Sequence, residues 1–513
     1  MCGFLVCFDY SKTRSKGEFL KVADRANWRG PDHSGYSEGA GGAIKFAHNR
    51  LAVIDVSVAS NQPLTSSCGR YTLVYNGEIY NYKELECSLD LECKSNSDSI
   101  FLLRAFEKCG QSIVSMLEGM FAFVVYDAHN NSFFAARDQL GIKPLFFYNG
   151  SRGLYFGSEA SLVAELCGAT HDFESYCEWE LFRRPVPGNS YFAGVQELLP
   201  GHYYNSYDAG PRRYWTLCEQ DTSSFSQDHF EALLAESVHS HCMSDVPVVS
   251  MLSGGIDSAV ITKLSGVNNS YTVGLVDNNE FAGALDSANE IGCSVRTVKV
   301  EDGELVDIWM ALTRLRGEPL SVPNEGLIYS LCRTLDPKEK VILTGEGADE
   351  LLFGYDKIFR WGFTASFDPM EFLSLYSYGH SGEQPRLYRF WSFIDDLRSG
   401  KTNIEFLEDF FIHFHLPGLL RRMDFASMAA SKEARVPFVS VRLFEYLYRR
   451  PYQLKILGSR SKIPIRIAAR NLGLTSCLDK PKVGFSASLG NNIPRIEEYK
   501  KFQSIIKKEL SWS

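Results

Sequence analysis

A glycine-rich loop between an apolar strand and a helix constrains the fold of this 513-residue chain most strongly. Residues 253–258 read Ser-Gly-Gly-Ile-Asp-Ser, after an apolar run at 247–252 and before helical spacing at 259–264. Similar apolar runs, separated by windows of helical spacing such as 327–335, lie at 271–275, 295–300 and 341–344. Strands separated by helices form βαβ units, so we predict an α/β domain with a parallel sheet. Aromatic residues and Leu at helical spacing over 356–450 predict helical additions packed on that sheet.

The loop at 253–258 has the chemistry of a phosphate site. A helix N-terminus presents free N–H groups, and glycines let a phosphate approach the backbone. Ser253 and Ser258 add hydroxyl donors, whereas the Gly-Lys-Ser/Thr ending of a P-loop is absent. A tight strand–helix turn without a ligand is the alternative interpretation.

Acidic residues beside this loop indicate a divalent cation. Asp257 lies within it, and residues 343–350, Leu-Thr-Gly-Glu-Gly-Ala-Asp-Glu, end another apolar run. Ligands of open α/β sheets bind beyond the carboxyl ends of the strands, so both loops are expected to face one site. We predict Asp257 and Asp349 as Mg²⁺ ligands that help to hold ATP and later pyrophosphate. Helix capping is the alternative for Glu346 and Asp349.

The first part of the chain has a different pattern of apolar residues from the second. Up to about residue 205, short apolar runs are broken by Gly, Asn, Asp and Pro, which is typical of a sheet-rich domain. Residues 205–225 are turn-forming and polar, so the boundary is placed there. The predicted domains are 1–210 and 225–513.

Several motifs carry a family resemblance. Met1-Cys2-Gly3, Arg-Gly-Pro-Asp at 29–32, Asn-Gly-Glu-Ile-Tyr-Asn at 76–81, and Ala-Arg-Asp with Gly-Ile-Lys-Pro across 136–144 resemble the class II glutamine amidotransferase domain. Residues 253–258 resemble the loop of ATP pyrophosphatases. Together, and nearly end to end, the chain resembles the glutamine-hydrolysing asparagine synthetase family. The resemblance implies an α+β N-terminal nucleophile hydrolase domain, an αββα sandwich, followed by an adenine nucleotide α-hydrolase-like α/β domain.

For the first domain, the resemblance implies glutamine hydrolysis. Met1 would be removed, leaving Cys2 as a nucleophile whose own α-amino group is the base. Asn76 and the N–H of Gly77 would form the oxyanion hole. Glutamine would be bound by Arg50 at its carboxylate and by Glu78 and Asp98 at its ammonium group, with further binding residues Leu51, Val53 and Ile54. Without the family, Arg50 would be a surface ion pair and Asp98 a helix N-cap.

For the second domain, the resemblance implies adenylation of a carboxylate by ATP and attack by ammonia. Lys462 would contact phosphates and Glu346 would act as a base. The ATP-binding residues would be Leu252, Ser253, Gly254, Gly255, Asp257, Ser258, Val273, Thr344, Gly345, Lys462 and Arg466. The segments 433–438 and 480–485 match landmarks that border the synthetase site. Two coupled sites also imply a shielded path for ammonia.

The acceptor is the least constrained part of this prediction. The family usually follows Arg-Val-Pro-Phe with Leu-Asp, and here Val439-Ser440 stand instead. Aspartate is the expected acceptor. A second hypothesis is another carboxylate, such as a sugar acid of a surface polysaccharide, and a third is a non-catalytic homologue that binds nucleotide or glutamine.

Composition excludes other classes. The formal net charge of −9 disfavours nucleic acid and anionic membranes as partners. The thirteen cysteines contain no Cys-x-x-Cys pair, so twelve are expected to be free thiols and Cys2 the exception. No signal peptide or membrane span is expected, so a cytoplasmic enzyme is predicted. The oligomeric state is left open, with a homodimer as one option.

Overall fold

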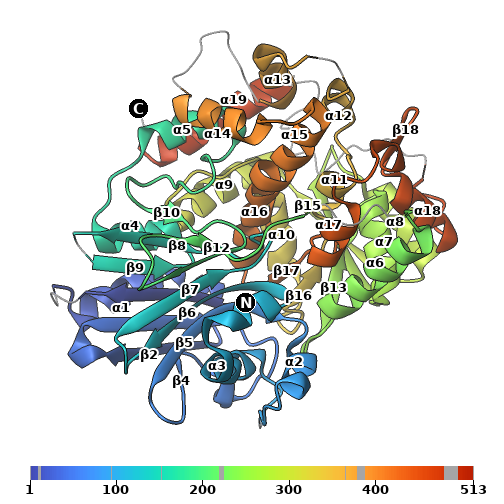
Figure 1. Cartoon of the computed structure of the whole chain (residues 1–513). Coiled ribbons are helices and arrows are strands. Elements are labelled where there is room, and N and C mark those ends of the chain that lie inside the picture. Colours follow the sequence, from blue (N-terminus) through green and yellow to red (C-terminus); the bar gives the residue numbers. More distant parts are fainter. Residues whose placement is uncertain are drawn as a thin grey trace.

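The computed structural model describes residues 2–9, 13–93, 95–151, 153–218, 224–363, 366–377, 387–478 and 495–511. Its first part contains two antiparallel sheets (Figure 1). One has the order β10 (Gln196–Glu197), β8 (Phe146–Gly150), β9 (Gly153–Gly157), β1 (Cys2–Phe8), β3 (Ile44–Arg50) and β2 (His33–Gly39). The other has the order β12 (Arg212–Arg213), β11 (His202–Asn205), β7 (Ser132–Arg137), β6 (Gly119–Asp127), β5 (Tyr71–Ile79) and β4 (Leu64–Thr65).

These sheets form the middle of an αββα sandwich. Alternate residues of β1 explain the layers, because Phe4, Val6 and Phe8 pack against β5 and β6 of the other sheet. Leu5 and Cys7 face the opposite way, toward α1 (Lys16–Ala23) and α4 (Ala160–Cys167). The outer face of the second sheet is covered by α2 (Tyr82–Ser88) and α3 (Asp98–Cys109). The predicted αββα sandwich is confirmed.

The second part is built on a parallel sheet of five strands. Its order is β15 (Ser294–Val300), β14 (Asn269–Leu275), β13 (Val248–Met251), β16 (Val341–Leu343) and β17 (Glu433–Arg435). All four strand pairs are parallel, as the alternation of strands and helices predicted. Because β14 and β16 lie on opposite sides of β13, the strand order reverses at β13. This is the topological switch point at which open α/β sheets bind ligands.

Helices cover both faces of this sheet (Figure 1). One face packs on α9 (Asp302–Arg316), α10 (Glu325–Thr334) and α19 (Arg495–Glu509). The other packs on α6 (Gln227–His241), α7 (Ile256–Ser265), α8 (Phe281–Ile291), α17 (Val441–Leu447) and α18 (Ile463–Asn471). The helical additions over 356–450 are also present, with an aromatic-rich core shared by α12 (Asp356–Trp361), α13 (Pro369–Tyr376), α14 (Tyr388–Arg398), α15 (Asn403–Phe410) and the turn that leads into α16 (Leu416–Met428).

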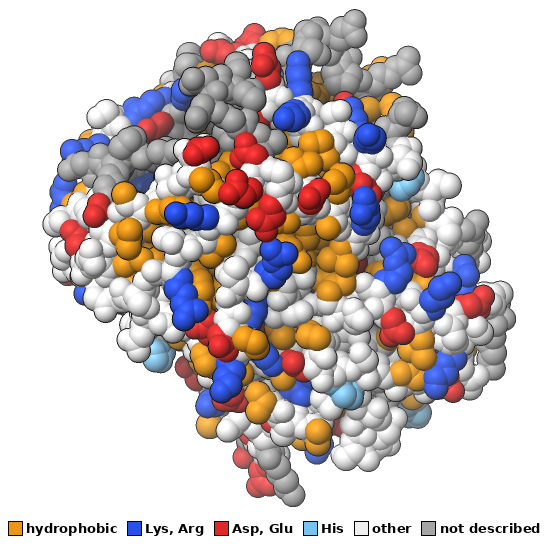
Figure 2. Space-filling model, turned by 180° about the vertical axis from the view of Figure 1, so that it is seen from behind, with side chains coloured by type: hydrophobic (Ala, Val, Ile, Leu, Met, Phe, Trp, Pro, Cys, Tyr) orange, Lys and Arg blue, Asp and Glu red, His pale blue; other side chains and the backbone are white. Residues whose placement is uncertain are grey.

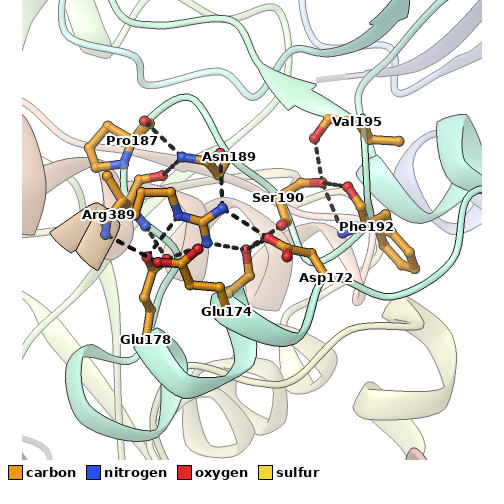
Figure 3. A network of polar contacts seen from close by, with 11 residues as sticks. Asp172, Glu174, Glu178, Pro187, Asn189, Ser190, Phe192, Val195 and Arg389 are labelled. Atoms are coloured by element: carbon orange, nitrogen blue, oxygen red, sulfur yellow. Dashed lines mark hydrogen bonds and ion pairs between the residues drawn. The ribbon is translucent and has the colours of Figure 1, made fainter. Parts of the chain in front are cut away.

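An arginine of these additions binds the first part of the chain (Figure 3). Arg389, on α14, donates from Nε to Glu178 Oε1 at 2.9 Å and from Nη1 to Asp172 Oδ2 at 3.0 Å. Its Nη2 donates to Glu178 Oε2 and to Ser175 Oγ, both at 2.9 Å. These partners lie on or beside α5 (Phe173–Phe182). Arg389 therefore fastens α14 to α5 through a two-point contact with a carboxylate.

Replacing this arginine should destabilise the protein. The Glu178 side chain is fully buried, so Arg389→Met leaves a buried carboxylate without its cation, at a cost of about 3 kcal/mol. The free energy of unfolding, measured by urea denaturation, reports the loss. Arg314→Met is the matched control, because Arg314 makes an ion pair with Glu509 but its side chain is 66% exposed. An equal loss in both variants would contradict the role of Arg389.

The described structure has a charged surface and no disulfide bond. In the described part of the chain, no helix combines the length and apolar character needed to cross a membrane. On the face shown in Figure 2, Lys and Arg side chains are interspersed with Asp and Glu. All thirteen cysteines lie within the described residues, and none of them is joined in a disulfide bond there.

Candidate active sites

The predicted nucleophile lies where the two antiparallel sheets meet. Cys2 begins β1 and is paired in register with Arg50, the last residue of β3. Its backbone N–H donates to Asn76 Oδ1, on β5 of the other sheet, at 2.9 Å. The Asn76 side chain thereby directs its Nδ2 elsewhere, and this buried donor has no hydrogen-bond partner in the described structure. Such a donor is what an oxyanion hole requires.

Burial governs the chemistry of the Cys2 thiol. It raises the pKa of Cys2, an effect opposed in part by a backbone hydrogen bond at Leu51 and by the charge of Arg50. The thiol therefore needs a base to become a thiolate. The proposed base is the α-amino group exposed by loss of Met1, a residue outside the described structure.

Two glycines of the family motifs permit this close packing. A Cβ at Gly30 would lie 2.3 Å from the carbonyl carbon of Arg50. Gly77 has φ +158°, and a Cβ there would lie 2.1 Å from the Met120 carbonyl oxygen. Any larger residue at either position would push apart the backbone segments that hold Arg50 and the predicted oxyanion hole.

Arg50 is buried, and among the described residues it forms no ion pair of the kind considered above. Its Nη1 donates to the Ser57 carbonyl at 2.7 Å and to Asn61 Oδ1 at 2.8 Å, and its Nη2 reaches the Ile54 carbonyl at 3.4 Å. The neighbouring Leu51 and Val53 are buried as well. The acceptors of Arg50 are neutral, so its positive charge remains available for a carboxylate.

The predicted ammonium-binding carboxylates are both buried. Asp98 Oδ2 accepts from Tyr75 Oη at 2.7 Å and from the Ile79 N–H at 3.2 Å. The N-cap of α3 is Ser97, so the capping alternative for Asp98 is wrong. Burial raises the pKa of Glu78 well above its usual value, and Glu433 and Asp98 raise it further. An ammonium group would relieve this repulsion.

No role was predicted for Arg29 itself, although it lies in one of the family motifs. Arg29 is fully buried, and its Nε donates to the Cys2 carbonyl at 3.0 Å. Its two Nη atoms form ion pairs with Glu159 at 2.6 Å and with Asp424, on α16, at 2.8 Å. Arg29 thus fixes the backbone of Cys2 to a helix of the second part.

Strand β17 brings the second part into direct contact with the residues predicted to bind glutamine. Arg435 Nη2 lies 3.5 Å from Glu78 Oε1, and Arg435 Nε lies 2.5 Å from Glu433 Oε1. The Arg435 carbonyl accepts from the Thr344 N–H at 2.9 Å. Burial acts to raise the pKa of Glu433, but Arg435 and Lys143 help to hold it at about 2. The segment expected to border the synthetase site therefore contacts both predicted sites.

The glycine-rich loop lies at the switch point of the parallel sheet. Ser258 Oγ accepts from the Ser253 N–H at 3.0 Å, and Ser253 Oγ accepts from the Gly255 N–H at 3.1 Å. A Cβ at Gly345 would lie 2.9 Å from the Ser258 nitrogen. The loops after β13 and β16 are therefore in contact, as their strand positions predicted.

The two predicted metal ligands, Asp257 and Asp349, both contact the ammonium group of Lys462. Lys462 Nζ lies 2.6 Å from Asp257 Oδ2 and 2.6 Å from Asp349 Oδ1. The remaining oxygen of Asp257, Oδ1, is buried without a hydrogen-bond partner in the described structure. A pair of carboxylates, one with an oxygen to spare, fits a hard divalent cation such as Mg²⁺ that keeps other ligands from water and phosphate.

The other predicted synthetase residues lie within β14, in the loops after β13 and β16, and on α18. Glu346 Oε1 forms an ion pair with Arg422 Nη2, on α16, at 2.8 Å, and Arg422 was not predicted. Leu252 and Thr344 are buried directly after β13 and β16, and Val273 is buried within β14. Arg466 donates to the Ser461 carbonyl at 2.8 Å, so it does not point at the carboxylates. The landmark at 480–485 lies outside the described residues.

Comparison with known proteins agrees with both halves of this arrangement. Residues 1–215 match the model of a glutamine amidotransferase domain, and residues 229–509 match that of asparagine synthase. Asparagine synthetase [glutamine-hydrolyzing] 3 of Bacillus subtilis is 28% identical over 92% of this chain and 84% of its own length. Asparagine synthetase [glutamine-hydrolyzing] 1 of the same organism is 27% identical over 94% and 87%. Amidase chyE of Penicillium rubens is 30% identical over 65% and 54%.

The fold and these matches define a glutamine-dependent amidotransferase, a carbon–nitrogen ligase that takes its nitrogen from glutamine and uses ATP as a substrate. The chain belongs to the asparagine synthase family.

Proposed function

We propose that this enzyme converts aspartate to asparagine, with glutamine as nitrogen donor and with ATP cleaved to AMP and pyrophosphate. The observation that carries the proposal is the convergence of Asp257, Asp349 and Lys462 at the switch point of the parallel sheet. Such a cluster would hold the phosphates of ATP through a divalent cation and the Lys462 ammonium group. Mg²⁺, bound by Asp257 and Asp349, would supply charge neutralisation on the phosphates.

In the first half-reaction, the Cys2 thiolate attacks the glutamine amide carbonyl. Asn76 Nδ2 and the Gly77 N–H bind the developing oxyanion. The α-amino group of Cys2 passes the thiol proton to the amide nitrogen, and ammonia leaves. Water then hydrolyses the thioester to glutamate. Arg50, Glu78 and Asp98 hold the zwitterionic end of glutamine, with Leu51, Val53 and Ile54 beside them.

In the second half-reaction, the acceptor carboxylate attacks the α-phosphorus and pyrophosphate leaves. Lys462 offsets the phosphate charge. Ammonia then attacks the acyl-adenylate, Glu346 accepts a proton from the attacking nitrogen, and AMP leaves. The contacts of Arg435 with Glu78 and with Thr344 favour a short, buried route for ammonia between the two sites.

A second acceptor class is favoured by one local departure from the family. Val439 packs on Gly347, where an added Cβ would lie 2.4 Å from Val439 Cγ2. Gly347 follows Glu346 directly, so a change at residues 439–440 reaches the loop that carries the predicted base. A carboxylate other than that of aspartate is the alternative substrate.

An acceptor screen for pyrophosphate release separates these proposals. Purified enzyme with ATP, Mg²⁺ and glutamine should release pyrophosphate and asparagine when aspartate is added. Release with a sugar or peptide carboxylate but not with aspartate would favour the second class. ADP and phosphate as products would contradict acyl-adenylate chemistry altogether.

A further inference from the structure

The side chain of Lys462 occupies the position between the predicted metal ligands. Its Nζ is equidistant, at 2.6 Å, from Asp257 and Asp349, and only 5% of the side chain is exposed. The carboxylates themselves are 16% and 15% exposed. The side chain is therefore an ammonium cation shared by both aspartates.

The backbone is built to hold this contact. Lys462 adopts a left-handed conformation with φ 58°, which is uncommon for a residue with a side chain and aims it from the start of α18. At Gly354, a Cβ would lie 1.8 Å from Asp349 Oδ1 and 2.4 Å from Lys462 Cε. Three separate segments thus meet tightly around one ammonium–dicarboxylate cluster.

We propose that Lys462 is an internal cation that occupies the carboxylate pair until nucleotide binds, so that a divalent metal binds together with ATP and only weakly before it. The inference rests on the proposed function in one respect, that Asp257 and Asp349 are the metal ligands. It adds a second role for Lys462 and couples the binding of metal and nucleotide.

Charge and geometry give the reason. A Mg²⁺ ion requires oxygen ligands at about 2.0–2.1 Å, and here the same oxygens already contact an ammonium group. Two cations between one pair of carboxylates repel each other. A triphosphate offers Lys462 another anionic partner, so nucleotide binding can draw the ammonium away and release both carboxylates to the metal. By linkage, bound metal must favour nucleotide by the same factor.

Metal titration of the nucleotide-free protein tests this role. Mn²⁺ binding is followed by electron paramagnetic resonance and Mg²⁺ binding by calorimetry, for the full chain and for Lys462→Met. We expect the variant to bind Mn²⁺ about tenfold more tightly than the unaltered protein does. Adding a non-hydrolysable ATP analogue should strengthen metal binding by a larger factor in the unaltered protein than in Lys462→Met. Mg²⁺ should also raise the thermal midpoint of Lys462→Met alone.

Two further variants test whether the position of the Lys462 charge, and not positive charge in general, controls metal affinity. Arg470→Met removes one positive charge from the exposed end of the same helix and should leave metal affinity within about twofold. Asp257→Asn in the Lys462→Met background should cancel the gain, because it removes a ligand. Equal metal affinity in Lys462→Met and unaltered protein, or an equal gain from Arg470→Met, would overturn the proposal. No acceptor or turnover is involved, so failure to amidate aspartate would leave this test intact.

Discussion

Cys2→Ala should abolish glutamine-dependent amidation while leaving synthesis from ammonium salts within about twofold of the unaltered enzyme. Thiol attack on the amide has no substitute at this position, and we expect a loss of at least about a thousandfold. The second active site contains no atom of Cys2, and its cluster of Asp257, Asp349 and Lys462 lies on other elements. Glutamate formation and acceptor-dependent pyrophosphate release, measured separately, give the two activities.

The matched control is Cys7→Ala. Cys7 is also a buried cysteine of β1 but faces the outer helices, so its replacement should keep both activities. Mass spectrometry of the unaltered protein should show that Met1 is absent. If Cys2→Ala also eliminated ammonia-dependent synthesis, the proposal of two independent active sites would be wrong. If it kept glutaminase activity, Cys2 would not be the nucleophile.

Glu346→Gln should have the opposite phenotype. Loss of a general base at the acyl-adenylate should reduce acceptor-dependent pyrophosphate release and amide formation by about a hundredfold or more. Glutamine is important as the replacement, because it can still accept a hydrogen bond from Arg422, whose guanidinium is 2.8 Å from Glu346. An alanine would leave that buried cation unpaired and confuse loss of chemistry with loss of packing.

Glutaminase activity provides the internal control for this variant, because Cys2, Asn76 and Arg50 are unaffected. Glu371→Gln, on the exposed start of α13, removes the same charge at a distance and should change neither activity. Unchanged amide synthesis by Glu346→Gln would remove Glu346 from the mechanism. An equal loss of both activities would indicate damage to the fold.

The elements of the fold were largely predictable, because their patterns are local. Apolar runs at 271–275 and 295–300 became β14 and β15, and helical spacing at 327–335 became α10. The order of strands in the sheet was not predictable, since pairing of β17 with β16 depends on a crossover of about ninety residues between them. The pairing of β17 with β16 nevertheless places Arg435, the last residue of β17, beside Glu78.

The candidate sites were predictable where residues lie within one loop. Residues 253–258 contain their own phosphate-site chemistry, and Asp257 and Asp349 follow strands that proved to be neighbours. Arg29 and Arg422 were not predicted to act, because their partners are far away in sequence: Asp424 for Arg29, and Glu346 for Arg422. Nothing near these arginines in the sequence indicates which carboxylate they meet. The domain limits 1–210 and 225–513 remain predictions.

The sequence by itself determined the two fold classes, the family and the residue types available for catalysis, because motifs and periodicity are properties of short segments. Only the tertiary structure decided which charges share a buried space. It placed Lys462 between Asp257 and Asp349 and Arg435 beside Glu78. The physical reason is that a buried ion must be compensated within a few ångströms, and packing, not sequence distance, determines which counter-ion lies that close.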